Sequence, residues 1–169
     1  SPAAKEVALY RDALRLGYAR LGETGGLIPN SAIIDMFRLL KGRSDGFRVT
    51  PGTALKNEKT EEIVFVPPQD AREIVTHMTA LERFINDDGL SDLDPLIKMA
   101  LIHHQFESIH PFPDGNGRIG RILNVLYLTR TGLLDIPVLY LSRFITRNKA
   151  DYYQHLQDVR DTGNWENWV

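Results

Sequence analysis

A segment rich in proline and glycine, residues 110–117, separates two long stretches with helical spacing of apolar residues, and it limits how the chain can fold. Pro111 and Pro113 cannot lie inside a helix, because proline has no backbone N–H group and its ring clashes with the preceding turn. Gly115 and Gly117 permit backbone conformations and close approaches that other residues avoid. The segment therefore predicts a rigid loop that joins two helices.

Most of the remaining chain has the same helical periodicity. Helices are predicted over residues 3–21, from a cap at Asn30 or Ser31, from a cap at Asp70 to about residue 84, and over 94–108, 116–131 and, with short breaks, 139–160. Residues 47–66 differ, because Phe47, Val49 and the run 63–66 favour strands, with a polar hairpin tip at 56–60 between them. The sequence predicts one compact domain over residues 1–169, mainly α-helical, with a single β-hairpin.

Composition argues against several classes of protein. The formal net charge is −2, with 25% charged residues, which gives no sign of a surface for nucleic acid or an anionic membrane. The chain has no cysteine, so disulfides, thiolate catalysis and cysteine zinc sites are excluded, and we expect a cytoplasmic location. No apolar stretch is long enough to span a bilayer. Because the chain begins at Ser1 without a methionine, we expect it to be part of a longer protein.

The loop and the helix after it have the features of an anion-binding site. A glycine-containing loop that leads into a helix presents unpaired N–H groups and the positive end of the helix dipole. Arg118 and Arg121 are three residues apart, so both lie on one helix face and can reach back over the loop. Two cations in the first turns oppose the dipole at a cost of up to about 1 kcal/mol each. A bound polyphosphate would offset that cost.

Two further residues of the loop suggest chemistry. Asp114 would repel phosphate unless a hard cation lay between them, and Mg²⁺ held by one carboxylate and phosphate oxygens is the usual arrangement. His110 is the natural candidate for a general base, because an unperturbed histidine titrates near neutral pH. From the residues alone, other roles stay open: Asp114 as a turn or cap residue, Asn116 as a helix cap, and the arginines as solvated charges.

The stretch His110–Arg121 matches the whole pattern HxFx(D/E)GNGRxxR and so resembles the signature of the Fic family. A pattern of this length with eight specified positions is highly specific. The resemblance covers most of the chain, since residues 46–68 resemble the family's flap hairpin and residues 151–153 and 163–165 resemble segments of bacterial members. It implies the Fic fold and a protein adenylyltransferase, which moves AMP from its substrate ATP to a Ser, Thr or Tyr hydroxyl of a target protein.

The resemblance also implies a role for each motif residue. His110 would deprotonate the target hydroxyl, and Asp114 would hold Mg²⁺. The residues implied to bind ATP are Gly115, Asn116, Gly117, Arg118, Ile119, Gly120 and Arg121, with Tyr152 and Tyr153 lining the nucleoside pocket. Packing within a helix is the alternative for the tyrosines. The flap residues Ile63, Val64 and Phe65 would dock the protein substrate by strand pairing.

Many Fic proteins carry an inhibitory helix with the pattern (S/T)xxxE(G/N), whose glutamate pairs with the last arginine of the motif, here Arg121. Residues 162–167, which include Glu166, match this pattern. They occupy a Gly/Asn-Trp segment that family members share for reasons unrelated to inhibition. We therefore expect an inhibitory helix upstream of Ser1 or in a separate chain, or a homodimer, as the regulatory partner.

Other functions stay open. The same scaffold can transfer UMP, phosphocholine or phosphate, or remove AMP. Kinase-like relatives usually lose the second glycine or the last arginine, whereas Gly117 and Arg121 are present here. A non-catalytic nucleotide- or partner-binding domain is the alternative of a different class, and the intact motif argues against it. A metal hydrolase is the weakest alternative, because its candidate residues fit no common zinc spacing; they are His103, His104, Glu107 and His110.

Overall fold

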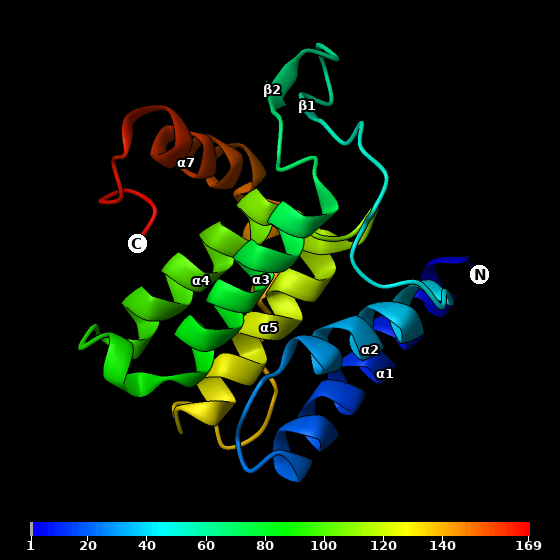
Figure 1. Cartoon of the computed structure of the whole chain (residues 1–169), viewed down its shortest axis with the longest axis vertical. Helices are drawn as coiled ribbons and strands as arrows, with labels where there is room; N and C mark the ends of the chain where they lie inside the picture. Colours follow the sequence, from blue (N-terminus) through cyan, green and yellow to red (C-terminus); the bar gives the residue numbers. More distant parts are fainter. Residues whose placement is uncertain (1) are drawn as a thin grey trace.

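The protein, described over residues 2–169 in a computed structural model, consists of helices and one small hairpin (Figure 1). The elements in chain order are α1 (Pro2–Glu23), α2 (Asn30–Lys41), β1 (Leu55–Lys56), β2 (Ile63–Phe65), α3 (Ala71–Asn86), the 3₁₀ helix η1 (Asp88–Leu90), α4 (Pro95–Ile109), α5 (Asn116–Arg130), α6 (Leu141–Arg147) and α7 (Lys149–Thr162). The predicted fold class, mainly helical with one hairpin, is confirmed. Among the described residues, no helix is both long and apolar enough to cross a membrane.

One helix begins at the cap that the sequence predicted, and another does not. The Asp70 side chain caps α3 by accepting hydrogen bonds from the N–H groups of Arg72 and Glu73, which satisfies donors that have no partner inside the helix. The predicted cap of α2 is wrong, because Pro29 is the N-cap and no side chain caps this end. Asn30 instead donates its side-chain N–H to the carbonyl of Met78 at 3.0 Å, so it joins α2 to α3.

The strands are shorter than predicted. Leu55 pairs with Phe65 and Lys56 with Ile63, with an irregularity between them. Phe47 and Val49, which have strand propensity, lie outside any strand. The Phe47 ring instead packs against Phe112, with 5.5 Å between the ring centroids. Packing of a partly buried aromatic ring outweighs local strand propensity here, since that propensity depends on context.

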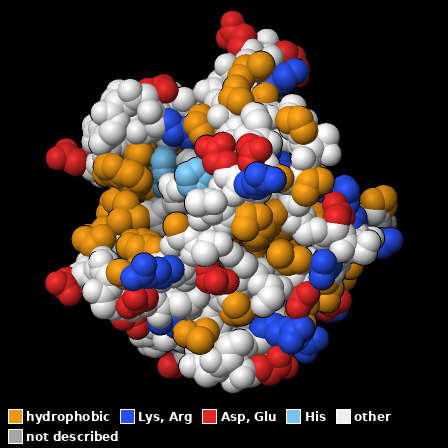
Figure 2. Space-filling view, viewed as in Figure 1, with side chains coloured by type: hydrophobic (Ala, Val, Ile, Leu, Met, Phe, Trp, Pro, Cys, Tyr) orange, Lys and Arg blue, Asp and Glu red, His pale blue; other side chains and the backbone are white. Residues whose placement is uncertain are grey.

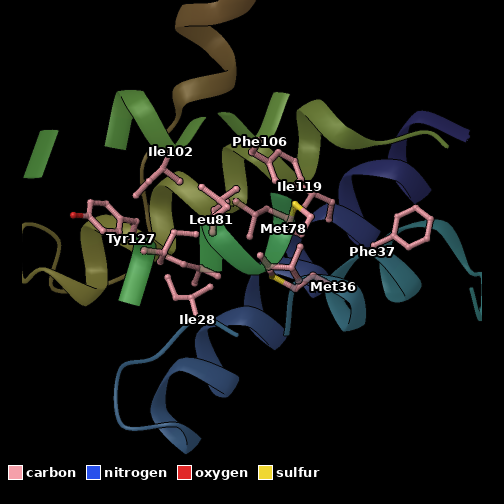
Figure 3. Packing of buried hydrophobic residues seen from close by; sticks show 14 of the residues in the cluster. Ile28, Met36, Phe37, Met78, Leu81, Ile102, Phe106, Ile119 and Tyr127 are labelled. Atoms are coloured by element: carbon pink, nitrogen blue, oxygen red, sulfur yellow. The ribbon is translucent and has the colours of Figure 1, made fainter. Parts of the chain in front are cut away.

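Helix α5 lies at the centre of the molecule, with α1 and α2 on one side and α3 and α4 on the other (Figure 1). Nearly every residue from Ile119 to Leu128 is buried, as expected for a helix enclosed on all sides. Apolar side chains of the surrounding helices, including Met36, Met78 and Ile102, converge there (Figure 3). α1 approaches closely at Gly17, where a Cβ atom would lie 2.6 Å from Leu126 Cδ1. Because α5 is enclosed, the position of its first turn is fixed, and so is the position of the loop that leads into it.

The hairpin stands away from the helical body at the end of the molecule where α7 begins (Figure 1). Its strand residues Ile63 and Val64 are exposed by 59% and 43%, and Val66 by 56%. In the space-filling view, hydrophobic side chains and charged side chains near the tip both reach the surface of this projection (Figure 2). Lys149 at the start of α7 forms an ion pair with Glu58 at 2.6 Å, so the tip contacts α7.

Candidate active site

His110 is placed at the end of α4 by an unusual backbone conformation. It has φ 50° and ψ 57°, in the left-handed region that non-glycine residues seldom adopt. The pKa of its imidazole is lowered to about 4, mainly by burial and less by the nearby Arg48 and Arg160, while the Glu107 carbonyl and Asp114 oppose the shift. The side chain is therefore neutral at physiological pH and can accept a proton.

The loop after His110 is closed on itself by Asn116. The backbone N–H of Phe112 donates to Asn116 Oδ1 at 2.9 Å, and Asn116 Nδ2 donates to the Phe112 carbonyl at 2.7 Å. Phe112 is fully buried and stacks on Phe37 of α2 with 4.1 Å between ring centroids. Two buried hydrogen bonds and one stacked ring therefore hold the loop in this conformation.

The start of α5 presents backbone donors beside this loop. Gly115 is the N-cap, with φ 83°, which favours glycine. The first intrahelical hydrogen bond runs from the N–H of Ile119 to the carbonyl of Gly115, so the N–H groups of residues 116–118 precede it. Because the Asn116 side chain is engaged with Phe112, its contribution to an anion site would come from the backbone. These groups have the geometry of a phosphate-binding helix N-terminus.

Charged side chains surround the outer face of the loop. Arg118 forms an ion pair with Glu6 of α1 at 2.6 Å, and its guanidinium lies 3.8 Å from the Asp114 carboxylate. Lys41, at the end of α2, forms an ion pair with Asp114. This lysine lowers the pKa of Asp114 below its ordinary value. Asp114 is therefore ionised at neutral pH and lies among cations, with an exposed side chain.

Arg121 lies on the inner side of the loop beside a buried carboxylate. A Cβ atom at Gly117 would be 3.3 Å from Arg121 Nη1 and 3.9 Å from Glu107 Oε1. A Cβ atom at Gly120 would be only 2.8 Å from the same carboxylate oxygen. Neither Glu107 Oε1 nor Arg121 Nε has a hydrogen-bond partner among the described residues. The absence of a Cβ atom at the two glycines leaves room for these side chains.

We predict that Glu107→Gln makes the protein more stable at pH 8. Burial raises the pKa of Glu107 to about 7, although Arg121 and Arg160 oppose the rise. Because its pKa in the folded state is above the ordinary value of 4.5, Glu107 contributes stability to the fold that is fully present below pH 4.5. This contribution is lost as pH rises through 7, where the buried carboxyl must ionise. The gain of the glutamine variant at pH 8 should be on the order of 3 kcal/mol, since one pKa unit corresponds to about 1.4 kcal/mol.

Urea unfolding of both proteins between pH 5 and pH 8 measures this effect. The advantage of the glutamine variant should shrink as pH falls towards 5, where Glu107 in the folded parent is already neutral. Glu62→Gln is the matched control and should show no such trend, because Glu62 is exposed and its carboxylate accepts a hydrogen bond from the Thr60 hydroxyl. A constant difference between variant and parent across this range would contradict an unusual titration of Glu107.

The other predicted site residues differ in accessibility. The Tyr152 hydroxyl lies 2.8 Å from His103 Nε2, so this tyrosine joins α7 to α4. Tyr153 is 53% exposed and is the more open of the two tyrosines to a ligand. Phe65 of the flap packs under Arg160, whose guanidinium carbon is 3.9 Å from the ring centroid. Ile63 and Val64 of the flap are exposed by 59% and 43%.

The alternative of a metal hydrolase finds no matching geometry. His103 is engaged with Tyr152, and His104 Nε2 lies 3.2 Å from the Leu156 carbonyl. Over residues 2–169, no three His, Asp or Glu side chains come together in a way that could hold a metal ion. A Cβ atom at Gly120 would lie 2.8 Å from Glu107 Oε1 and 3.1 Å from His103 Cε1, so both side chains lie beside this glycine.

Sequence reasoning missed several residues that the fold brings to the site. They are Glu6, Lys41, Arg48 and Arg160, together with the position of Glu107 beside Arg121. Glu107 carries one usable signal, because it precedes His110 by three residues and so shares its helix face. The others come from distant elements and have no local pattern that distinguishes them from surface charges.

The chain is similar in sequence to known proteins. The model of the Fic/DOC family matches residues 29–128. A "Probable protein adenylyltransferase" of Aquifex aeolicus is 39% identical over 69 residues, which cover 41% of this chain and 19% of that protein. A protein adenylyltransferase of Caenorhabditis briggsae is 31% identical over 127 residues, which cover 73% of this chain and 22% of that protein. The chain thus spans about a fifth of the length of these curated relatives.

The fold is also found in solved structures. A Fic family protein of Desulfovibrio desulfuricans superposes with a TM-score of 0.76 at 22% sequence identity, over 97% of this chain and 48% of that one. At this identity the likeness concerns the fold alone. The family model covers more than half of the chain and includes the whole stretch from His110 to Arg121. The chain belongs to the Fic/DOC family.

Proposed function

We propose that this chain is the catalytic part of a protein adenylyltransferase, which transfers AMP from ATP to a Ser, Thr or Tyr hydroxyl of another protein. The strongest support is that the fold brings all the residues of the motif together in one place. A neutral histidine ends α4, a closed loop follows it, and the N-terminus of α5 carries two arginines. The names of the relatives support the same activity.

In the proposed reaction, His110 accepts the proton of the target hydroxyl. The hydroxyl oxygen then forms a bond to the α-phosphorus of ATP, and the bond from that phosphorus to the oxygen bridging to the β-phosphate breaks. Pyrophosphate leaves, and the AMP group stays on the target. The N–H groups at the start of α5, with Arg118 and Arg121, would bind the polyphosphate, since such chemistry depends mainly on positioning and charge neutralisation.

The residues present fit a magnesium ion held at Asp114. Its carboxylate is ionised and 62% exposed, and lies beside the phosphate-binding donors. One carboxylate together with phosphate oxygens and water is a common way to hold Mg²⁺. When bound, the ion would neutralise charge on the phosphates. Lys41 and Arg118 already place positive charge on this carboxylate, so a cation there would replace the Lys41 contact.

The proposed reaction is tested with ATP that carries a radioactive label on one of two different phosphates. The protein is incubated with Mg²⁺, a host lysate and ATP labelled either at the α- or at the γ-phosphate. AMP transfer predicts labelled protein bands with α-label only, and mass spectrometry should find one AMP group on a hydroxyl side chain. Labelling with γ-label would indicate a kinase, competition by UTP would indicate UMP transfer, and no label would favour a non-catalytic nucleotide-binding domain.

We predict that Val64→Pro lowers labelling of the target without changing nucleotide affinity. Ile63 and Val64 are exposed in β2, which pairs with β1 alone among the described strands. An exposed strand edge can pair with an added segment through its backbone groups. Proline removes one backbone donor from that strand. Target labelling and the affinity for MgATP, measured by calorimetry, are the two readouts.

Val64→Thr is the matched control, because threonine keeps the backbone N–H group and the branched Cβ atom. It should label the target like the parent protein. Neighbouring residues of a strand present their N–H groups to opposite sides, so Ile63→Pro removes the donor on the other side of β2 and separates pairing with β1 from pairing with a target. An equal loss of labelling and of nucleotide affinity in the proline variants would show that the hairpin supports the fold and does not dock the target.

A further inference from the structure

Arg48 is a buried arginine whose role no motif explains. It lies in the segment between α2 and β1 and is only 5% exposed. No ion pair joins it to a carboxylate anywhere in the described chain. A guanidinium taken out of water must find acceptors, because an unpaired buried charge is strongly unfavourable. The acceptors that Arg48 has found therefore indicate what it does.

All the acceptors are backbone carbonyls, and most of them lie where α4 ends and the loop after His110 begins. Arg48 Nε donates to the His110 carbonyl at 2.8 Å, and one terminal nitrogen donates to the Ile109 carbonyl at 3.2 Å. The same terminal nitrogen contacts the Pro68 carbonyl, where the chain leaves the hairpin. The backbone N–H of Arg48 donates to the Pro111 carbonyl at 2.8 Å. Arg48 thus donates hydrogen bonds to three consecutive backbone carbonyls, those of Ile109, His110 and Pro111.

These contacts act where the backbone is least favourable. His110 has the left-handed conformation, which a residue with a Cβ atom keeps only when its surroundings impose it. The carbonyls of Ile109 and His110 lie at the end of α4, where helix carbonyls lack partners and the dipole attracts a cation. Arg48 supplies both the hydrogen bonds and the positive charge at this point.

We propose that Arg48 is a positioning residue that holds His110 in the left-handed conformation and joins it to the exit of the target-docking hairpin. The role of Arg48 in positioning His110 does not depend on the proposed function. Only its expected effect on the rate of AMP transfer rests on that function. The direction in which the imidazole leaves the backbone depends on this conformation. A base displaced by about 1 Å can cost about 10²-fold in rate.

The charge of Arg48 gives a second consequence. The charged groups around the His110 imidazole are Arg48 from the segment after α2, Arg160 from α7 and Asp114 from the loop, besides the carbonyl of Glu107 in α4. Both arginines lower the pKa of His110, and Asp114 opposes them. Removing the Arg48 charge should therefore raise the pKa of His110 and bring it closer to its ordinary value.

The experiment compares Arg48→Gln, Arg48→Lys and the control Arg38→Gln in the whole chain. Arg38 also donates to a backbone carbonyl of the same segment, that of Asp45 at 3.2 Å, but it is exposed. Backbone ¹³C chemical shifts of His110 by NMR report its conformation, and its imidazole resonance gives the pKa. Calorimetry with MgATP gives the affinity, and incorporation of α-labelled ATP gives the rate.

Arg48→Gln should move the His110 shifts away from the left-handed range and raise its pKa. It should lower the rate by about 10²-fold with less than about a twofold change in affinity. Arg48→Lys, which keeps the charge, should keep the low pKa and recover part of the rate, and Arg38→Gln should match the parent. If Arg48→Gln does not fold, Arg48→Lys with a parent-like rate and unaltered His110 shifts overturns the proposal.

Three results overturn the proposal when Arg48→Gln folds. They are parent-like shifts and pKa of His110, a parallel loss of nucleotide affinity and rate, and a loss of rate that disappears at a lower temperature. The last result would mean that Arg48 only stabilises the fold. The NMR readouts need no turnover, so they decide on Arg48 even when the parent transfers no AMP. Absence of transfer by the parent contradicts the proposed function alone.

Discussion

Replacement of His110 by alanine should lower AMP transfer by about 10²–10⁴-fold, the usual contribution of a general base, while MgATP still binds. His110 ends α4 and precedes the donors of α5, so it contributes no group to the proposed phosphate site. Because burial holds its pKa at about 4, it should act as a base over the whole neutral range. The acid limb of the rate profile should lie well below pH 6.5, the ordinary value for histidine.

Incorporation of α-labelled ATP and calorimetry with MgATP separate the two effects. His77→Ala is the matched control, because His77 lies on α3 with an exposed side chain beside Glu73. It should leave both quantities unchanged. A rate near that of the parent in the His110→Ala variant would mean that another group removes the proton. A large loss of affinity in that variant would mean that His110 shapes the nucleotide site instead.

Replacement of Asp114 by asparagine should abolish the dependence of nucleotide binding on Mg²⁺. The substitution keeps the shape of the side chain but removes the charge that a magnesium ion requires. The rate should fall by about 10²-fold or more, since metal ions contribute several kcal/mol of charge stabilisation. Without Mg²⁺, the variant should bind ATP no more weakly than the parent, because Lys41 and Arg118 lose a competing carboxylate.

The affinity for ATP is measured for both proteins in Mg²⁺ and in a chelator. Asp45→Asn is the control, because Asp45 is an exposed aspartate outside the sequence motif and pairs with Arg43. The ratio of the two affinities should be large for the parent and for this control and close to one for Asp114→Asn. The same ratio in all three proteins would show that Asp114 is not the metal ligand.

The sequence determined the parts of the site that depend on neighbouring residues. Pro111 and Pro113 predicted the loop, the glycines predicted the entry into α5, and the spacing of Arg118 and Arg121 placed both in the first turns of α5. These features follow from local sterics and helical geometry, which do not need the rest of the chain. The helices and the single hairpin were predictable for the same reason, because periodicity and turn chemistry are local.

The sequence was less informative wherever a residue could serve two purposes. Phe47 has strand propensity, yet its ring lies against Phe112. Asn30 is a good helix cap, yet it donates to the Met78 carbonyl. Asn116 was a candidate for capping or phosphate binding, and its side chain closes the loop on Phe112. In each case a contact with a more distant residue outweighed a local preference.

Only the tertiary structure decided which charges surround the motif. Glu6 and Lys41 reach Arg118 and Asp114 from α1 and α2, and Arg48 reaches His110 from 62 residues away in sequence. Each is an ordinary charged residue in its own segment, and nothing local distinguishes it from a solvated one. Its role arises when helices dock around α5, because burial removes water and makes each charge depend on the partner that packing brings to it.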